Sequence, residues 1–416
     1  MMKRVLIPLC IILASVLPMT ACATGEVKKP CVSGIENALP RVVHSKVEFD
    51  QRMRAGATPL DAFTPFGKRE FIAGLVWNSD GKGIGGLSMA AMIRELGKDQ
   101  VEEVLDFLDL KKLSASIVQS LPQSPPLRFG EPDRAIEREW KATSTLIDTH
   151  VRLEETAGTT TNLGFDEVVA HYNGTLGAVL HQADLGSRSL TDLMLIFDAA
   201  SNVASATGDS ATYRDMQTVF AELERRKVDT RRVFDARMLS GLVVQRRFDE
   251  AREFLAEHPD SHAEKIPDLT DSLGSGFNGR SVMDLDPQTH SLDRQAIANT
   301  AGTQVIMMVG ATCHFSLEAL EAIAANGDLR NRLHQAKLLI LTPPGANLQL
   351  AAVGMWNARH PELPMRIPWS RAEWKAVDVA QVPQFLIFEN GKLKQRILGW
   401  EGNQAALSEA LGRLDP

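Results

Sequence analysis

The stretch that decides the fold is residues 303–316, TQVIMMVGATCHFS, in which an apolar run ends at Cys313. A run of this length and composition predicts a buried strand beginning at Thr303. Helix-forming residues follow the cysteine at once, so the chain is expected to turn from strand to helix there. The turn would put the sulfur of Cys313 at a helix N-terminus, where the helix dipole and free backbone N–H groups favour the thiolate.

A second informative stretch, Val382 to Phe388, reads as a short apolar strand that opens with Val382-Pro383. Asn390-Gly391 follows it and is a strong hairpin signal, which predicts a partner strand from Leu393 to Leu398. The remaining expected elements of this region are helices over 316–326, 328–336, 347–359 and 404–414 and a strand over 337–341.

The order of these elements over residues 291–416 resembles the thioredoxin fold. The resemblance implies that Cys313 takes the place of the nucleophilic cysteine and Pro383 that of the cis-proline, with Val382 and Pro383 forming a substrate groove. The family's Cys-x-x-Cys motif reads Cys-His-Phe-Ser here. Ser316 stands in the resolving position, where it cannot release a mixed disulfide by attack. It could still donate a hydrogen bond to the Cys313 thiolate, and a protonated His314 would favour that thiolate further.

Three interpretations of Cys313 remain open. In the first, a monothiol enzyme forms mixed disulfides that a small thiol, another protein or Cys31 resolves. In the second, the groove beside Pro383 binds extended peptide without turnover, and the protein is a scaffold with helical repeats as its binding surface. In the third, Cys313 is a small buried residue of the core.

Composition excludes some classes of function. The chain has 416 residues and a net charge of −7, which argues against nucleic acid as the main partner. None of the Cys and His spacings resembles a zinc site, and neither a metal nor a cofactor is expected. The expected partners are protein or small-molecule thiols and, through an N-terminal lipid, a membrane.

The N-terminus is typical of an export signal. Lys3 and Arg4 precede an apolar stretch, and residues 1–21 are interpreted as a signal peptide. Met19-Thr20-Ala21-Cys22 resembles a bacterial lipobox, although Met19 replaces the usual leucine. The sequence therefore predicts lipidation of Cys22 and a periplasm-facing envelope protein, on the outer rather than the inner membrane. Plain secretion after cleavage at an A-x-A-like site is the alternative.

The rest of the chain is expected to be mostly helical. Residues 22–60 are interpreted as a tether and 61–130 as a small α+β or helical region, with a strand from Arg69 to Trp77. An all-α region over 133–262 and a Ser/Asp/Gly-rich linker over 263–290 follow, with the alternative that this linker contains the first strand of the last domain. The predicted fold class is thus a multidomain chain, mostly α-helical in its N-terminal and middle regions, with a C-terminal α/β thioredoxin-like domain.

A short sequence pattern is repeated within the helical region. Phe197-Asp198-Ala199 recurs as Phe234-Asp235-Ala236, and Tyr213 and Phe248 occupy similar contexts. The spacing resembles tetratricopeptide repeats. Two similar helix hairpins in an irregular all-α region are the alternative, because a free-standing stack normally needs three repeats.

Cys22 is expected to carry lipid, because the lipobox-like residues follow the apolar stretch directly. Intact-mass analysis of the protein purified from membranes should show an acylated N-terminal cysteine. An unmodified N-terminus at Thr24 would instead indicate plain secretion.

Overall fold

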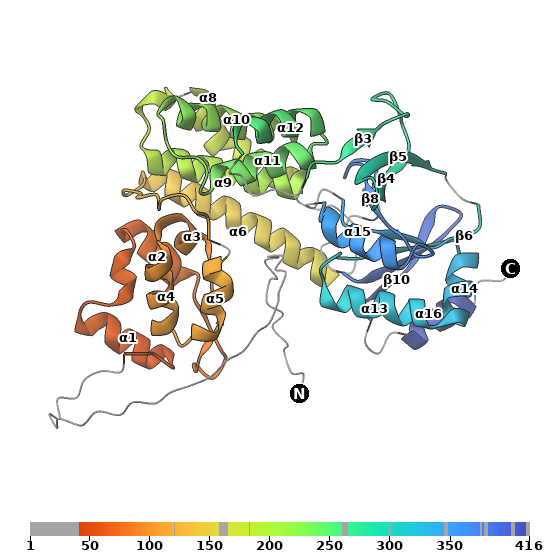
Figure 1. The fold of residues 1–416 in the computed structure, drawn as a ribbon, viewed down its shortest axis with the longest axis horizontal. Coiled ribbons are helices and arrows are strands. Elements are labelled where there is room, and N and C mark those ends of the chain that lie inside the picture. The colour runs from red at the N-terminus through yellow and green to blue at the C-terminus, as the bar shows by residue number, and fades with distance from the viewer. Residues whose placement is uncertain are drawn as a thin grey trace. The chain divides into compact units, whose positions relative to one another are not determined.

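The computed structural model describes residues 41–119, 121–157, 165–182, 184–259, 265–298, 301–344, 348–374, 377, 382–400 and 404–412 (Figure 1). The signal segment, Cys22 and Cys31 lie outside these residues. The chain divides into two compact units, Met1–Pro132 and Asp133–Pro416, each of which is described on its own. Within the described part of the chain, no helix combines the length and apolar character needed to cross a membrane.

The first unit is mainly helical. Its elements are α1 (Lys46–Ala55), η1 (Pro59–Ala62), α2 (Pro65–Ala73), β1 (Val76–Trp77), β2 (Ile84–Gly86), α3 (Ala90–Glu95), α4 (Lys98–Phe107) and α5 (Lys111–Gln119). β1 and β2 form a small antiparallel pair. Residues from helices and loops share one apolar core, in which Leu60, Phe71 and Met92 are fully buried.

Two expectations for this unit differ from the structure. The last part of the expected tether is folded. Ser45 caps α1 by accepting from the backbone N–H of Glu48, and Phe49 and Leu60 are buried in the core. The strand expected from Arg69 is a helix up to Ala73. Thr64 accepts from the N–H of Gly67 and Pro65 occupies the first turn, a combination that starts a helix.

The second unit begins with helices. They are α6 (Arg134–Ala157), α7 (Phe165–Gly174), α8 (Leu176–Gln182), η2 (Leu185–Ser187), α9 (Leu190–Thr207), α10 (Ser210–Arg225), α11 (Phe234–Val244) and α12 (Phe248–Glu257). Phe197 of α9 and Phe234 of α11 are both buried and meet edge to face, with ring centroids 5.1 Å apart. The equivalence of the pairs α9–α10 and α11–α12 as repeats stays a prediction.

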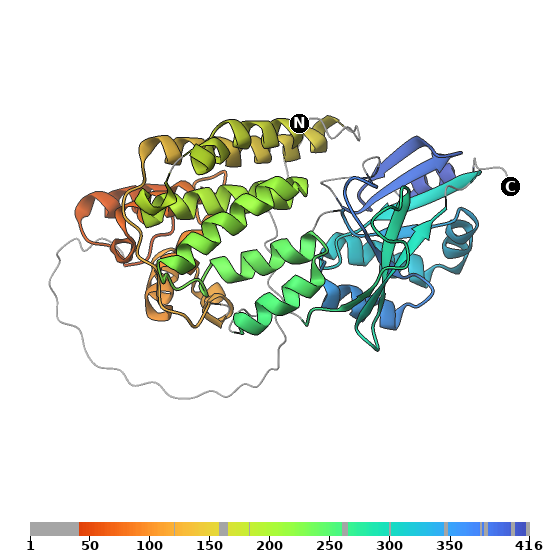
Figure 2. The same cartoon turned by 90° about the horizontal axis from the view of Figure 1, so that it is seen from above.

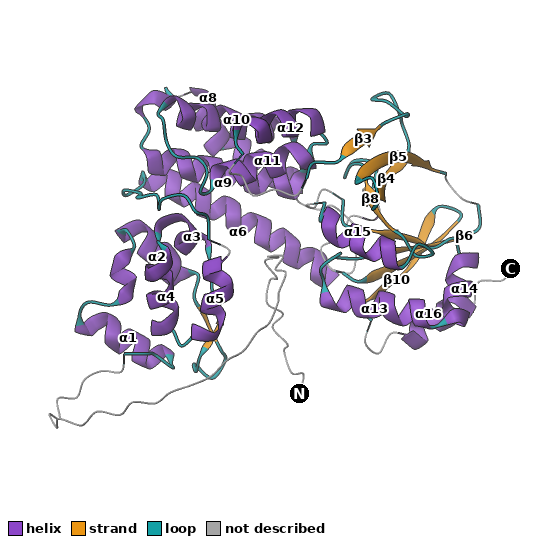
Figure 3. Cartoon of the chain, viewed as in Figure 1, coloured by secondary structure: helices purple, strands orange, loops and turns teal. Residues whose placement is uncertain are grey.

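The rest of this unit is built around a sheet that has eight strands within the described residues (Figure 3). Its order is β10-β9-β6-β7-β8-β4-β5-β3. The strands are β3 (Asp268–Thr270), β4 (Arg280–Asp286), β5 (Ser291–Ile297), β6 (Thr303–Met308), β7 (Leu339–Leu341), β8 (Met365–Pro368), β9 (Gln384–Glu389) and β10 (Lys392–Leu398). β6, β7 and β8 are parallel, β9 runs antiparallel to β6, and β10 runs antiparallel to β9. The register of β9 and β10 shifts between Leu393 and Gln395.

The helices of the sheet region follow the expected order. They are α13 (His314–Ala325), α14 (Gly327–Gln335), α15 (Leu350–Arg359) and α16 (Gln404–Gly412). The carboxylate of Glu321 in α13 lies 3.7 Å from Arg359 and 3.5 Å from His360, at the end of α15. The fold class predicted from the sequence is therefore confirmed: helical N-terminal and middle regions precede a C-terminal α/β region in the thioredoxin order.

The segment expected to be a linker, 263–290, contains strands β3 and β4. Val282 and Met283 are fully buried, and β4 pairs with β5 on one side and with β8 on the other. The Ser, Asp and Gly residues that suggested a linker lie largely in the turns between these short strands. The pairing with β8 sets Val282 opposite Pro368, and local sequence does not report a contact between residues so far apart in the chain.

A buried arginine holds strands β3, β4 and β5 in place. Arg294 of β5 is 3% exposed, and its guanidinium lies 4.0 Å from the ring centroid of Trp369. It donates to Glu373 Oε1 at 2.8 Å, to Asp271 Oδ2 at 3.0 Å and to Ser281 Oγ at 2.9 Å. The buried charge is thus fully compensated, and three separate segments share it.

A second arginine joins the helical segment to the sheet of the same unit. Figure 2 shows the last helices of this segment beside the sheet region. Arg246, just after α11, donates to the carbonyls of Pro368 at 2.9 Å and Trp369 at 3.0 Å. Burial lowers the pKa of Arg246 to about 10, which still leaves it charged at neutral pH.

Replacing Glu373 by Gln should destabilise the sheet region by about 2–4 kcal/mol, because it leaves part of the Arg294 charge buried without its carboxylate. Hydrogen exchange of the β4 and β5 amides should report the loss. Glu389→Gln is the matched control, since Glu389 pairs with Lys394 at an exposed site and should change stability by no more than about 1 kcal/mol. Equal effects of the two changes would contradict the role given to the cluster.

Candidate functional site

Cys313 lies where the sequence predicts it, in the turn between β6 and α13. It is the N-cap residue of α13, with φ −79° and ψ 119°, and it is partly exposed. Its N–H donates to the carbonyl of Gly310 at 3.0 Å, and its carbonyl accepts from the N–H of Leu317 at 3.0 Å. The sulfur therefore sits at the positive end of the helix dipole, and partial exposure excludes the interpretation of Cys313 as a fully packed core residue.

Val382 and Pro383 lie beside this turn. The pairing of β6 with β9 sets Met308 opposite Gln384, so the residues just before β9 come close to the residues just after β6. The Val382–Pro383 peptide bond is cis, and Cys313 Sγ lies 3.9 Å from the carbonyl oxygen of Val382. The structure thus brings together Cys313, Val382 and Pro383 from segments 69 residues apart.

Gly310 makes this approach possible, and the sequence reasoning missed it. A Cβ at position 310 would lie 2.8 Å from the Cβ of Cys313 and 3.2 Å from Cγ2 of Val382. The first distance is shorter than side chains tolerate, so only glycine lets the three residues pack as they do. The signal in the sequence is a glycine between the apolar run of β6 and the cysteine.

Ser316 does not face the sulfur in the way the sequence suggested. Its side chain is fully buried, and its Oγ accepts a hydrogen bond from the N–H of Gly310 at 3.1 Å. Ser316, Ala319, Leu320 and Ile323 form the buried stripe of α13. The serine hydroxyl therefore fixes the turn that carries Cys313.

His314 points to the outer surface of α13. Its Nε2 lies 2.8 Å from Oε1 of Glu318, one helical turn away, and the two side chains are 79% and 44% exposed. A protonated His314 would therefore have a carboxylate as its nearest partner, which offsets its effect on the sulfur.

Two further features complete the surroundings of the sulfur. Phe315, in the first turn of α13, exposes 47% of its surface next to Cys313. Thr312 Oγ1 is buried without a hydrogen-bond partner among the described residues. Among all the residues that the structure describes, no three His, Cys, Asp or Glu side chains converge as metal ligands would.

No protein-family model matches the chain, and no curated protein matches it. Solved structures resemble parts of it. An uncharacterized thioredoxin-like protein from Porphyromonas gingivalis is 17% identical over 33% of this chain and 90% of its own, with a TM-score of 0.26. A thiol-disulfide isomerase from Corynebacterium glutamicum is 10% identical over 29% and 86%, with a TM-score of 0.23.

A thioredoxin-like protein from Bacteroides caccae is 11% identical over 70% of this chain and all (100%) of its own, with a TM-score of 0.23.

Gly310→Ala should slow alkylation of Cys313 in the folded protein or lower stability by about 1–3 kcal/mol, because the new methyl group must displace Cys313 or Val382. Iodoacetamide labelling at neutral pH and urea unfolding measure the two effects. Gly327→Ala is the control, since a Cβ there meets no atom within 4 Å. A Gly310→Ala protein that matches wild type in both measurements would refute the close-packing argument.

Proposed function

We propose that this protein acts in thiol–disulfide chemistry through Cys313 as its single nucleophile. The observation that carries the proposal is the position of Cys313: partly exposed, at the N-cap of α13, with its sulfur 3.9 Å from the carbonyl beside Pro383. A sulfur in that position lies at the positive end of the helix dipole and is accessible to a partner.

The proposed reaction is an exchange and needs no external oxidant. The Cys313 thiolate attacks one sulfur of a partner disulfide, a new S–S bond forms to Cys313, and the other partner sulfur leaves as a thiolate. A second thiol, from a small molecule or a protein, then attacks the partner sulfur, and Cys313 leaves as the thiolate. Ser316 lacks the sulfur needed for this second attack, so the resolving thiol must come from elsewhere.

The neighbours of Cys313 have separate roles in this proposal. Ser316 holds the turn through Gly310, while His314 and Glu318 pair with each other on the exposed surface of α13. Val382 and Pro383 border the sulfur and would contact the chain of a bound partner.

A non-catalytic binding module is the second candidate, and one observation favours it. Neither Ser316 nor His314 directs a polar group to Cys313, whereas Phe315 presents an exposed aromatic ring beside it. An exposed aromatic ring suits the binding of an apolar segment and is not needed for thiol exchange.

The proposed location is the bacterial cell envelope. The lipobox-like Met19-Thr20-Ala21-Cys22 supports a periplasm-facing lipoprotein, on the outer rather than the inner membrane, with soluble periplasmic protein as the alternative. An oxidising compartment of this kind supplies the disulfides that the proposed reaction needs.

Glutathione disulfide tests the activity in a Cys31→Ser background. Cys313 of the folded chain should gain a glutathione faster than Cys313 of the urea-unfolded chain does, because only the folded thiol has the helix terminus beside it. Intact mass and peptide mapping measure the adduct, and Cys313→Ser is the control that should gain none at that position.

A Ser316→Cys variant sharpens this test. It places a sulfur one helical turn from Cys313, so the adduct should resolve to a disulfide between Cys313 and the introduced thiol, with release of glutathione. Failure of Cys313 to react before the chain unfolds would reject the enzyme proposal and leave the binding module.

A further inference from the structure

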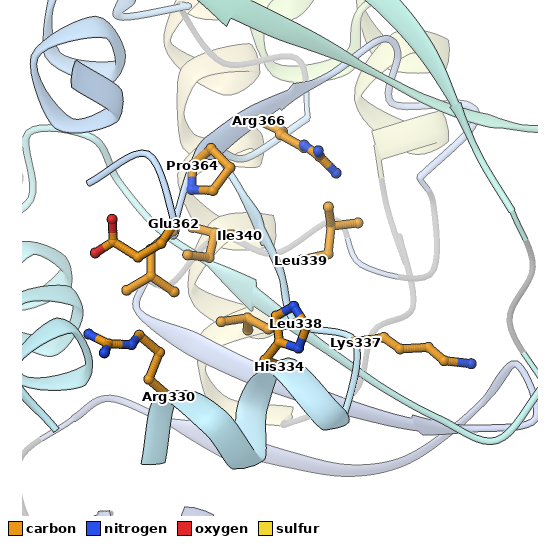
Figure 4. A pocket seen from close by; sticks show the side chains of 10 residues that line it. Arg330, His334, Lys337, Leu338, Leu339, Ile340, Glu362, Pro364 and Arg366 are labelled. Carbon is orange, nitrogen blue, oxygen red and sulfur yellow. The ribbon is translucent and has the colours of Figure 1, made fainter. Parts of the chain in front are cut away.

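A cavity of about 330 Å³ lies in the sheet region, away from Cys313 (Figure 4). Its lining comes from the end of α14, the start of β7 and the segment that leads into β8. The lining residues are Arg330, His334, Lys337, Leu338, Leu339, Ile340, Glu362, Leu363, Pro364 and Arg366. β6, β7 and β8 are parallel, and the cavity is lined by residues at the starts of β7 and β8. The cavity therefore lies at the N-terminal ends of these strands, whereas Cys313 follows the C-terminal end of β6.

The cavity combines an apolar floor with a charged rim. Ile340 and Leu363 are buried, with 3% and 5% of their surfaces exposed. The volume is at the lower end of the range of about 300–1,000 Å³ found for small-molecule sites, and an apolar lining with a few polar groups is typical of them. The cavity is therefore suited to a small molecule with an apolar body.

Cations outnumber anions on the rim. Arg330, Lys337 and Arg366 are opposed by Glu362 as the single carboxylate of the lining. Arg366 is already compensated by Asp284, whose Oδ1 lies 2.8 Å from its Nε. One positive charge therefore remains in excess, before any contribution from His334.

The two remaining cations bond to neutral groups. Lys337 Nζ donates to the carbonyl of Ala301 at 2.9 Å, and Arg330 Nη1 donates to that of Ala324 at 2.6 Å. Among the described residues, neither has a carboxylate within ion-pair distance. Figure 4 shows Lys337 and Arg366 extending from one side of the group and Arg330 and Glu362 lying on the other, with His334 between them.

We infer that this cavity binds a small organic monoanion, with its apolar part on Ile340 and Leu363 and its carboxylate at the side where Lys337 and His334 lie. A single excess positive charge matches a monoanion better than a dianion such as a phosphate ester. A cation would meet Arg330, Lys337 and Arg366 and gain only Glu362. The inference is independent of the thiol chemistry of Cys313.

Octanoate, octylamine and octanol form a matched set of probes, because they share an apolar chain and differ in the charge of the head group. The readout is the methyl NMR signals of Leu338, Leu339, Ile340 and Leu363 in the whole protein. Octanoate should shift these signals saturably, and octylamine and octanol should bind at least about tenfold more weakly.

Charge variants test the role of the rim. Lys337→Gln should weaken octanoate binding about tenfold, since it removes a charge-assisted contact. Glu362→Gln should strengthen binding a few-fold because it removes a like charge, an effect that a merely structural role of Glu362 would not produce. Lys392→Gln, an exposed lysine on β10, and Cys313→Ser should leave binding unchanged.

Thermal unfolding of each variant checks that it is folded. The inference is overturned if octanoate leaves these methyl signals unmoved, if octylamine shifts them equally, or if Lys392→Gln weakens binding as much as Lys337→Gln. It is also overturned if Glu362→Gln weakens octanoate binding.

Discussion

The close packing of Gly310 against Cys313 and Val382 is the contact on which the candidate site depends. Gly310 lies between the end of β6 and the start of α13 and meets Val382, two residues before β9. Its N–H donates to Ser316 and its carbonyl accepts from Cys313, so one glycine orders the whole turn. The site is therefore a product of the pairing between β6 and β9, and the chemistry of Cys313 cannot be separated from the packing of the sheet.

Local patterns in the sequence predict much of the sheet region. The apolar run before Cys313, the Asn390-Gly391 turn and the helical periods correspond to β6, the β9–β10 hairpin and helices α13 to α16. These elements are specified by residues close to each other in the chain, which is why periodicity and turn chemistry suffice. The position of Cys313 at a helix start follows from the same local signals.

Other features depend on contacts between distant residues, and the sequence does not report them. Strands β3 and β4 pair with β5 and β8, and the buried Arg294 of β5 is compensated by Asp271 and Glu373 from two other segments. The orientation of Ser316 is an intermediate case. It opens the stripe that continues with Ala319, Leu320 and Ile323, so the helical period predicts its burial once Cys313 is recognised as the N-cap.

The two edge strands of the sheet affect the behaviour of the protein in solution. β10 is one edge of the sheet within the described residues, and it carries Lys392, Lys394 and Arg396 together with a shift in register. The other edge, β3, is only three residues long. Lysines, bulges and short edge strands all oppose the addition of a strand from another molecule. Edges of this kind would keep the sheet region from aggregating with chains that expose unpaired strands.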